Sequence, residues 1–344
     1  MINQGILRLR AKICTWATAV GKKESEGPLG SCFDLRDPTD KFGQKTWEAA
    51  ESEMQRRALA LAIARRELKP EEIDLLFAGD LLNQCVASAY GLLEYPIPYC
   101  GIYGACSTSA EGLLLAGMAV TGGLATWSCT VTSSHYCAAE RQYRTPIEYG
   151  AQRSPTAQWT VTGAGAFLVG GAGEEGVPIT RGMVGIPQDS GVKDAANMGG
   201  AMAIAAANTL KRFFDRSGTM PEDYDRIISG DLGYEGGAIL CDLMRAEGID
   251  IRARYSDCGQ IIYDRDRQDV HSGGSGCGCA AVTLGGYLLP RLWEGVEKRI
   301  LFLPTGALMS PDSIKQGRTI PVVAHLVELE GRPLHSKKQE EGET

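Results

Sequence analysis

The segment Tyr103-Gly104-Ala105-Cys106-Ser107-Thr108-Ser109-Ala110-Glu111-Gly112 places a cysteine between a short apolar run and a long pattern of small residues. The apolar run, residues 95–103, predicts a strand, and the small residues after Cys106 predict a buried helix, so the turn between them is tight. A cysteine at a helix N-terminus meets unpaired N–H groups and the positive end of the helix dipole. Both effects favour the thiolate, so we expect Cys106 to be a nucleophile or part of a binding pocket.

Composition excludes several classes of protein. The chain has 344 residues, 44% of them hydrophobic and 22% charged, as in ordinary globular proteins. A net charge of −7, without a basic stripe, predicts no nucleic-acid partner. The eleven cysteines are odd in number and irregularly spaced, which indicates free thiols in a reducing compartment rather than a disulfide framework.

One uncharged stretch, between Glu111 and Glu140, is long enough to span a bilayer. It is interrupted by Gly122-Gly123 and rich in Thr, Ser and Cys, so a buried helix followed by a buried strand is the better interpretation. We therefore expect a soluble chain that is synthesised in the cytoplasm and has no transmembrane segment.

Strands and helices are predicted to alternate in the same order in two halves of the chain. In the first half we expect strands at 6–13, 73–78, 126–132 and 161–170, helices at 44–68 and 83–93, and a polar irregular excursion at 140–160. In the second half we expect helices at 195–214 and 237–246, strands at 225–229 and 299–303, and a helix from the turn Gly273-Gly274-Ser275-Gly276-Cys277-Gly278-Cys279 to Trp293.

The repeat can be quoted directly. Ile73-Asp74-Leu75-Leu76-Phe77-Ala78-Gly79-Asp80-Leu81 parallels Tyr224-Asp225-Arg226-Ile227-Ile228-Ser229-Gly230-Asp231-Leu232. Two such halves predict an α/β protein of predominantly parallel sheets covered by helices. We place the halves at residues 1–175 and 176–331, followed by a polar tail, 332–344, that we expect to be disordered.

Duplicated halves with a Gly-x-Cys-Ser turn resemble the thiolase superfamily, and one branch of it resembles this chain more specifically, the stage V sporulation protein AD family. An ordered set of segments from about Val20 to Glu330 carries the resemblance: 23–30, 78–84, 104–109, 132–135, 139–144, 148–150, 160–163, 273–277 and 305–311. The resemblance implies the thiolase-like five-layered αβαβα fold.

For function, the resemblance implies a protein that binds dipicolinic acid (pyridine-2,6-dicarboxylate) and assists its uptake into the developing spore. It implies peripheral association with the spore inner membrane, partners among the other spore membrane transport proteins of the same operon, and a homodimer. It implies no cofactor, although calcium could accompany dipicolinate.

Two alternatives remain open. The first is an acyltransferase or condensing enzyme that uses Cys106 with His135 or His271. A condensing enzyme needs a nucleophile, a base and an oxyanion hole. The glycine turn after residue 272 lacks the Gly-His-Pro motif of typical thiolases, so catalysis is the less favoured interpretation. The second alternative is a structural subunit of a spore membrane complex.

Several residues are candidates for ligand binding. Asp80 and His135 each follow a predicted strand, where ligands of parallel sheets gather, although carboxylates such as Asp80 more often cap the next helix or fix a turn, and His135 could equally be structural. Dipicolinate is a planar dianion, so guanidinium groups should take part. The full predicted set is Cys106, Ser107, Asp80, Asn83, His135, Arg141 and Arg144, with Arg153 as a further cation of the same excursion. Cys277 and Cys279 lack a second ligand pair, so we expect small core residues there and no metal site.

Overall fold

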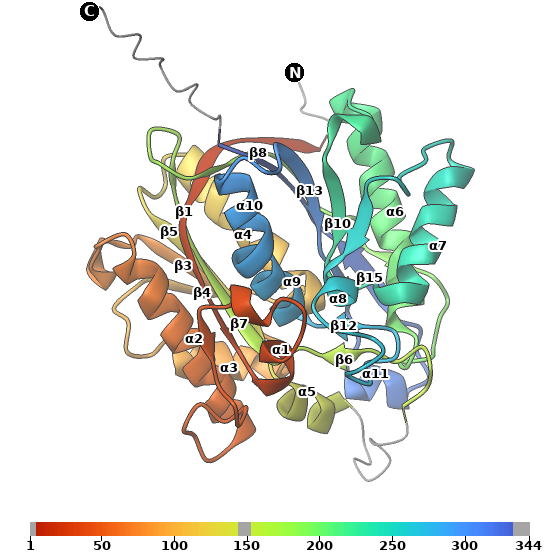
Figure 1. Cartoon of the computed structure of the whole chain (residues 1–344), viewed down its shortest axis with the longest axis horizontal. Helices are drawn as coiled ribbons and strands as arrows, with labels where there is room; N and C mark the ends of the chain where they lie inside the picture. The colour runs from red at the N-terminus through yellow and green to blue at the C-terminus, as the bar shows by residue number, and fades with distance from the viewer. Residues whose placement is uncertain (1–4, 144–152, 333–344) are drawn as a thin grey trace, which may run out of the picture.

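The computed structural model describes residues 5–143 and 153–332 (Figure 1). The tail predicted to be disordered therefore lies outside the described residues, apart from Arg332.

The strands of the first half are β1 (Ile6–Val20), β2 (Leu35–Arg36), β3 (Leu75–Gly79), β4 (Tyr99–Gly101), β5 (Ser128–Ser134), β6 (Trp159–Thr160) and β7 (Gly163–Gly171). Those of the second half are β8 (Val177–Met183), β9 (Gln188–Asp189), β10 (Arg226–Ser229), β11 (Tyr255–Asp257), β12 (Gly274–Ser275), β13 (Arg299–Leu303), β14 (Thr305–Ala307), β15 (Pro321–Ala324) and β16 (Leu326–Glu330).

The helices are α1 (Lys22–Ser25), α2 (Trp47–Ala64), α3 (Val86–Gly91), α4 (Thr108–Thr121), α5 (Tyr136–Tyr143), α6 (Met198–Ser217), α7 (Gly233–Ala246), α8 (Cys258–Ile261), α9 (Cys277–Thr283), α10 (Leu289–Trp293) and α11 (Pro311–Lys315). A π-helical turn, Leu284–Leu288, joins α9 to α10, so the helix expected to end at Trp293 does so.

The two halves repeat one strand order within a continuous sheet. That order is β11-β10-β13-β16-β8-β1-β7-β5-β3-β4, so β4-β3-β5-β7-β1 in the first half corresponds to β11-β10-β13-β16-β8 in the second. Strands β3, β4 and β5 pair in parallel, and β7 pairs antiparallel with both β5 and β1. Four of the five strands therefore run in one direction, and the second half has the same pattern. The halves join where β1 pairs antiparallel with β8.

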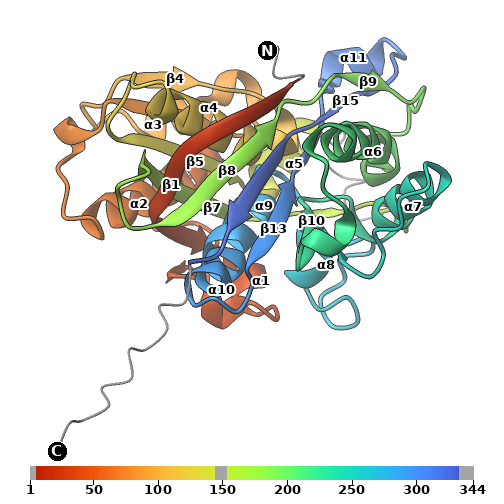
Figure 2. The same cartoon turned by 90° about the horizontal axis from the view of Figure 1, so that it is seen from above.

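Five layers follow from this arrangement. Figures 1 and 2 show α2 and α3 outside the first-half strands, α4 and α9 between the halves, and α6 and α7 outside the second-half strands. Three hydrophobic clusters fill the spaces between the layers: one around α2, one around α4 and α9, and one around α6 and α7. The fold is therefore the mixed α/β architecture of two matching halves that the repeat predicted, with the five thiolase-like layers that the resemblance implied.

Glycines let the central helices approach the sheet closely. A Cβ on Gly112 of α4 would lie 2.0 Å from Thr130 Oγ1 of β5, and one on Gly165 of β7 would lie 2.8 Å from the Ala281 side chain of α9. Small residues are required at these contacts, which explains why α4 and α9 have small-residue sequences.

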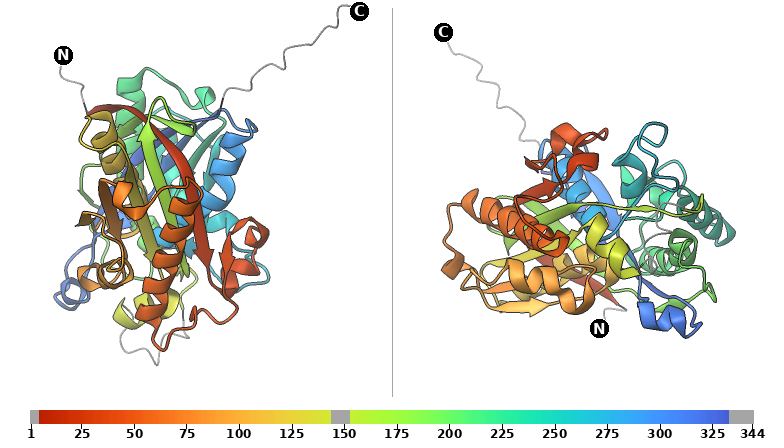
Figure 3. Two further views of the ribbon diagram at one scale, coloured as in Figure 1. Left: turned by 90° about the vertical axis from the view of Figure 1, so that its left-hand side faces the viewer. Right: turned by 90° about the horizontal axis from the view of Figure 1, so that it is seen from below.

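Several sequence predictions differ from the structure, and two of the differences lie near Cys106. The helix expected at 83–93 begins as a 3₁₀ turn, because Gln84 and Cys85 have φ of 56° and 51°, and only Val86–Gly91 is α-helical. The excursion expected to be irregular begins with a regular helix, α5. Figure 3 (right) looks onto the end of the molecule where α5 lies between the two halves. Among the residues that the structure describes, no helix combines the length and the apolar character needed to cross a bilayer.

Candidate functional site

The turn that holds Cys106 is tightly bonded. Thr108 Oγ1 accepts a hydrogen bond from the Gly104 N–H (3.0 Å) and donates one to the Ala105 carbonyl (2.6 Å). Ser107 Oγ donates to the Gly104 carbonyl (2.7 Å), so the hydroxyl of Ser107 is used within the turn and is fully buried. Ala105 has a φ of 51°, a left-handed conformation that costs a residue with a Cβ about 1 kcal/mol. The turn thus fixes the thiol at the start of α4.

A carboxylate from the other half of the chain faces this thiol. Asp231, which follows β10, is fully buried, and its negative charge acts on the thiol of Cys106. Its Oδ1 accepts from Thr305 Oγ1 (2.8 Å), and its Oδ2 accepts from the Gly276 N–H (3.1 Å). Burial raises the pKa of Asp231 to about 6, although these hydrogen bonds lower it.

The helix start favours a thiolate at Cys106, but the surroundings of the thiol oppose one. Burial, and then the negative charge of Asp231, hold the pKa of the Cys106 thiol well above its usual range. Removing the charged form from water outweighs the helix dipole, whose effect is typically no more than about 2 kcal/mol. The thiol is therefore un-ionised.

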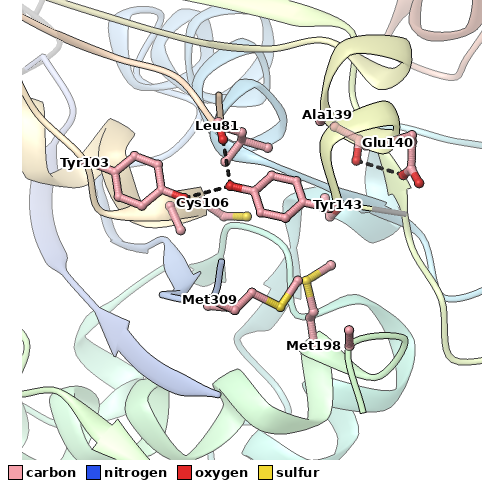
Figure 4. A pocket seen from close by; sticks show the side chains of 13 residues that line it. Leu81, Tyr103, Cys106, Ala139, Glu140, Tyr143, Met198 and Met309 are labelled. Carbon is pink, nitrogen blue, oxygen red and sulfur yellow. Dashed lines mark hydrogen bonds between the residues drawn. The ribbon is translucent and has the colours of Figure 1, made fainter. Parts of the chain in front are cut away.

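A partly open cavity lies beside Cys106 at the junction of the two halves (Figure 4). Its volume of about 70 Å³ has room for roughly five water molecules. Its lining is Leu81, Tyr103, Ala105, Cys106, Ala139, Glu140, Tyr143, Thr160, Ala195, Met198, Ser275, Ala307 and Met309. One carboxylate and no lysine, arginine or histidine occur in this set.

Two tyrosines meet across the cavity. Their hydroxyl oxygens are 2.9 Å apart, and Tyr143 Oη donates to the Leu81 carbonyl (2.8 Å). Because Tyr143 has a single hydroxyl proton, Tyr103 must donate to Tyr143. Figure 4 shows this pair beside the Cys106 thiol, with Met198 and Met309 opposite. On the α5 side, Thr160 Oγ1 donates to Glu140 Oε1 (3.2 Å).

Neither candidate histidine lines this cavity. His135 is fully buried, lies 5.4 Å from the Trp47 ring, and its Nε2 is 2.9 Å from the Asp40 carbonyl. Burial lowers the pKa of His135, so the ring is neutral. His271 Nδ1 lies 2.7 Å from the Ser154 carbonyl, and its Nε2 lies 3.1 Å from Asp269.

Asp80 occupies the first-half position that corresponds to Asp231. It is fully buried, and its carboxylate accepts from the Leu82 N–H (2.9 Å) and from both the N–H (2.8 Å) and the hydroxyl (2.7 Å) of Ser88. Asp80 therefore caps the turn before α3 and does not line the cavity at Cys106.

Asn83 and Arg141 come together, but in a different place. Both line an open hollow next to α3 and α5, where Arg141 forms an ion pair with Glu48. Asn83 donates its N–H to Gln142 Oε1 (2.9 Å). Arg144 lies outside the described residues.

Cys277 and Cys279 are fully buried at the start of α9. The thiol of Cys277 donates to the Ser133 carbonyl (2.9 Å) and that of Cys279 to the Gly230 carbonyl (3.4 Å). Within residues 5–143 and 153–332, no group of three or more His, Cys, Asp and Glu side chains is placed to hold a metal ion.

Sequence reasoning thus found Cys106 but missed most of its surroundings. Asp231 had a signal, since it stands opposite Asp80 in the quoted repeat, yet only the packing of the halves shows that Asp231 reaches the cysteine. Tyr143 and Met309 lie in two of the segments that carry the resemblance, 139–144 and 305–311, but nothing in those segments singled out these side chains, and Met198 lies in none of the segments.

The comparisons with known proteins agree with this fold. A family model described as stage V sporulation protein AD matches residues 4–330. A protein of Bacillus subtilis (strain 168) described as stage V sporulation protein AD is 43% identical over 313 residues, which cover 91% of this chain and 92% of that protein.

Solved structures with similar folds include OleA of Xanthomonas campestris bound with cerulenin. One of these structures superimposes on this chain with a TM-score of 0.60 at 17% sequence identity. The alignment covers 94% of this chain and 97% of the OleA chain. The 3-oxoacyl-[acyl-carrier-protein] synthase III of Aquifex aeolicus VF5 gives a TM-score of 0.56 at 15% identity, covering 93% of this chain and 99% of the synthase. At such identities the likeness concerns the fold alone.

Proposed function

This chain belongs to the stage V sporulation protein AD family, and from that premise we propose that it binds dipicolinic acid and assists its uptake into the developing spore. Membership makes it a protein of sporulation; the ligand and its transport are the proposal. The observation that carries the proposal is the small cavity beside Cys106, which keeps a partly open, hydroxyl-lined space without the groups that condensation requires.

The state of Cys106 favours binding over catalysis. A condensing enzyme needs a thiolate and a base within hydrogen-bond reach. Here the pKa of the thiol is raised by burial and by Asp231, and no histidine lines the cavity. The un-ionised thiol can donate a hydrogen bond to a carboxylate, and the Tyr103 hydroxyl can do so by exchanging Tyr143 for the ligand, while the apolar lining accepts an aromatic ring.

The charge of the cavity bears on the form of the ligand. Glu140 is the carboxylate among the described residues that line it, and its Oε1 accepts a hydrogen bond from Thr160. A calcium–dipicolinate chelate is neutral, and calcium accepts six to eight oxygen ligands, more than dipicolinate supplies. We propose that the cavity takes the chelate, with calcium arriving as part of the ligand and a Glu140 oxygen completing its coordination.

Calorimetric titration tests this proposal. We expect saturable binding of dipicolinate that is tighter with calcium than without it. Glu140→Gln should weaken binding of the chelate by about tenfold and should not weaken binding of free dipicolinate. Absence of saturable binding in both buffers would contradict the proposed function.

A cysteine pair provides a matched control. Cys106→Ala removes a donor and a contact from the cavity and should weaken binding about fivefold. Cys32→Ala, at an exposed thiol, should leave affinity unchanged. If the two variants bind dipicolinate with equal affinity, Cys106 is not part of the binding site.

Acyl transfer is the second candidate, favoured by one observation. The strained Ala105 presents Cys106 at a helix start, and backbone strain of this kind gathers at functional sites. This alternative predicts an acyl adduct on Cys106 after incubation with acyl-coenzyme A. Mass spectrometry that finds no adduct across several chain lengths would exclude it.

Partners and location complete the proposal. We propose peripheral association with the spore inner membrane through the transport proteins of the same operon, and a homodimer. Affinity capture from sporulating cells and sedimentation of the pure protein test these two points. Capture of membrane partners by a protein with no affinity for dipicolinate would favour the structural-subunit alternative.

A further inference from the structure

A cluster of cations and aromatic rings lies on Trp159, outside the cavity at Cys106. The Trp159 ring stacks on Tyr136 of α5, with centroids 3.7 Å apart and planes 8° apart. The ammonium of Lys23 lies 3.9 Å from the centroid of the Trp159 ring, and the guanidinium carbon of Arg153 lies 4.9 Å from it. We call Lys23, Arg153, Tyr136 and Trp159 the Trp159 cluster.

Arg153 is buried with part of its guanidinium unpaired. Its side chain is 5% exposed, and its Nη2 donates to the carbonyl of Asp269 (2.7 Å) and lies 2.9 Å from the Asp269 carboxylate. Its Nη1 is buried and has no acceptor. A buried charged donor without an acceptor is costly, so a bound oxygen at Nη1 would be stabilising.

Two cations meet at one ring in this cluster. Burial, and then the charge of Arg153, lower the pKa of Lys23. Asp269 is the carboxylate paired with Arg153, but its side chain is 77% exposed and also contacts His271. No carboxylate of the described chain lies within ion-pair distance of Lys23. An anion bound here would relieve the repulsion between the two cations.

The Trp159 cluster shares two elements with the cavity. Trp159 and Thr160 are successive residues of β6, so their side chains point to opposite faces, and Thr160 lines the cavity. Tyr136 and Glu140 lie one turn apart on α5, and Glu140 also lines the cavity.

We propose that the Trp159 cluster is a second binding subsite, which takes a small dicarboxylate anion between the Lys23 ammonium and Arg153 Nη1. The choice of dipicolinate as that anion rests on the proposed function. Its free dianion suits this subsite, whereas the neutral calcium chelate suits the cavity with Glu140, so the two subsites differ in the charge they accept.

Acetylation of the native protein tests the subsite without any variant. An anion beside Lys23 should raise its pKa again and cover its amine, so acetic anhydride should modify it more slowly. Benzene-1,3-dicarboxylate and dipicolinate, each without calcium and at matched ionic strength, should slow acetylation of Lys23 at least about fivefold. Lys22, exposed beside it, is the internal control. Unchanged acetylation of Lys23 with both dianions would overturn the subsite.

Titration of calcium-free dipicolinate separates this inference from the proposed function. Lys23→Gln and Arg153→Gln should each weaken binding about tenfold, and Lys22→Gln should not. If the wild type binds and both variants keep its affinity, the subsite is wrong and the function stands. If the wild type never binds dipicolinate but benzene-1,3-dicarboxylate protects Lys23, the function is wrong and the subsite stands.

Discussion

The thiol of Cys106 shows how burial decides chemistry at the scale of one residue. Helix α4 begins two residues later and offers its positive end to the thiol. The thiol is nevertheless enclosed, and its closest charge is the carboxylate of Asp231. Both effects disfavour the thiolate, so reactivity should be low in spite of the helix.

Alkylation measures this directly. At pH 8 we expect iodoacetamide to modify Cys106 at least roughly tenfold more slowly than the exposed Cys32 and Cys100, because the thiolate is the nucleophile. Asp231→Asn removes a negative charge and should increase the rate at Cys106. Peptide mapping by mass spectrometry gives all the rates in one sample, and equal rates at Cys106 and Cys32 would contradict the assignment.

Buried acids make stability depend on pH. Glu24 is 1% exposed, and burial raises its pKa to about 7, against the lowering effect of hydrogen bonds from Tyr263 and the Thr162 N–H. Burial likewise raises the pKa of Asp257 to about 7. The folded state thus keeps protons that the unfolded state gives up, so stability is lost as pH rises from the unfolded pKa to the folded one.

For Glu24 this window runs from 4.5 to about 7. Urea unfolding should show a wild type that is less stable at pH 8 than at pH 5, with roughly 3 kcal/mol of the difference due to Glu24. Glu24→Gln should remove that part of the difference, and Glu71→Gln, at an exposed residue, should not. An unchanged pH dependence in Glu24→Gln would refute the role of this carboxyl.

At the scale of elements, the packing of α4 against β5 determines where the cavity lies. Gly112 allows the helix to approach Thr130, whose hydroxyl is buried without a partner. A methyl group at residue 112 would push α4 away from the sheet and with it the turn that holds Cys106.

Gly112→Ala should therefore destabilise the protein by about 2 kcal/mol, since overpacking outweighs the better helix propensity of alanine. Gly171→Ala, where nothing lies within 4 Å of the added Cβ, should change stability little. Thr130→Ala should restore much of the loss in the double variant, as a thermodynamic cycle would show. Equal effects at Gly112 and Gly171 would disprove the tight contact.

At the scale of the whole molecule, the two halves depend on each other. The central cluster contains residues of α4 and α9 together with strands of both halves, and β1 pairs with β8 across the boundary. Separating the halves would expose this cluster and leave β1 without one of its neighbours.

We expect the fragment 1–175 to lack a fixed fold by itself. Near-ultraviolet circular dichroism should show no native signal, and denaturant should produce no cooperative transition. Mixing it with the fragment 176–344 should recover part of the signal. A cooperative transition in the first fragment alone would show that the half is an independent domain.

The order of apolar and polar residues along the chain determined much of the fold. Strand β13 has the predicted bounds, β3, β5, β7 and β10 lie within two residues of theirs, and the quoted repeat predicted two matching halves. Strands β8 and β16 were not predicted, although β8 pairs with β1 at the boundary of the halves and β16 lies between β13 and β8. Their places in the sheet match those of β1 and β7 in the first half, so they follow from the duplicated arrangement.

The sequence by itself determined the elements, their duplication and the turn that presents Cys106, because these follow from periodicity and from residues close along the chain. Only the tertiary structure decided that Asp231 of the second half faces Cys106, that Asp80 caps a turn instead, and that Lys23 and Arg153 share one indole ring. Contacts between distant segments set the burial and the charge around a side chain, and these set its pKa and its chemistry.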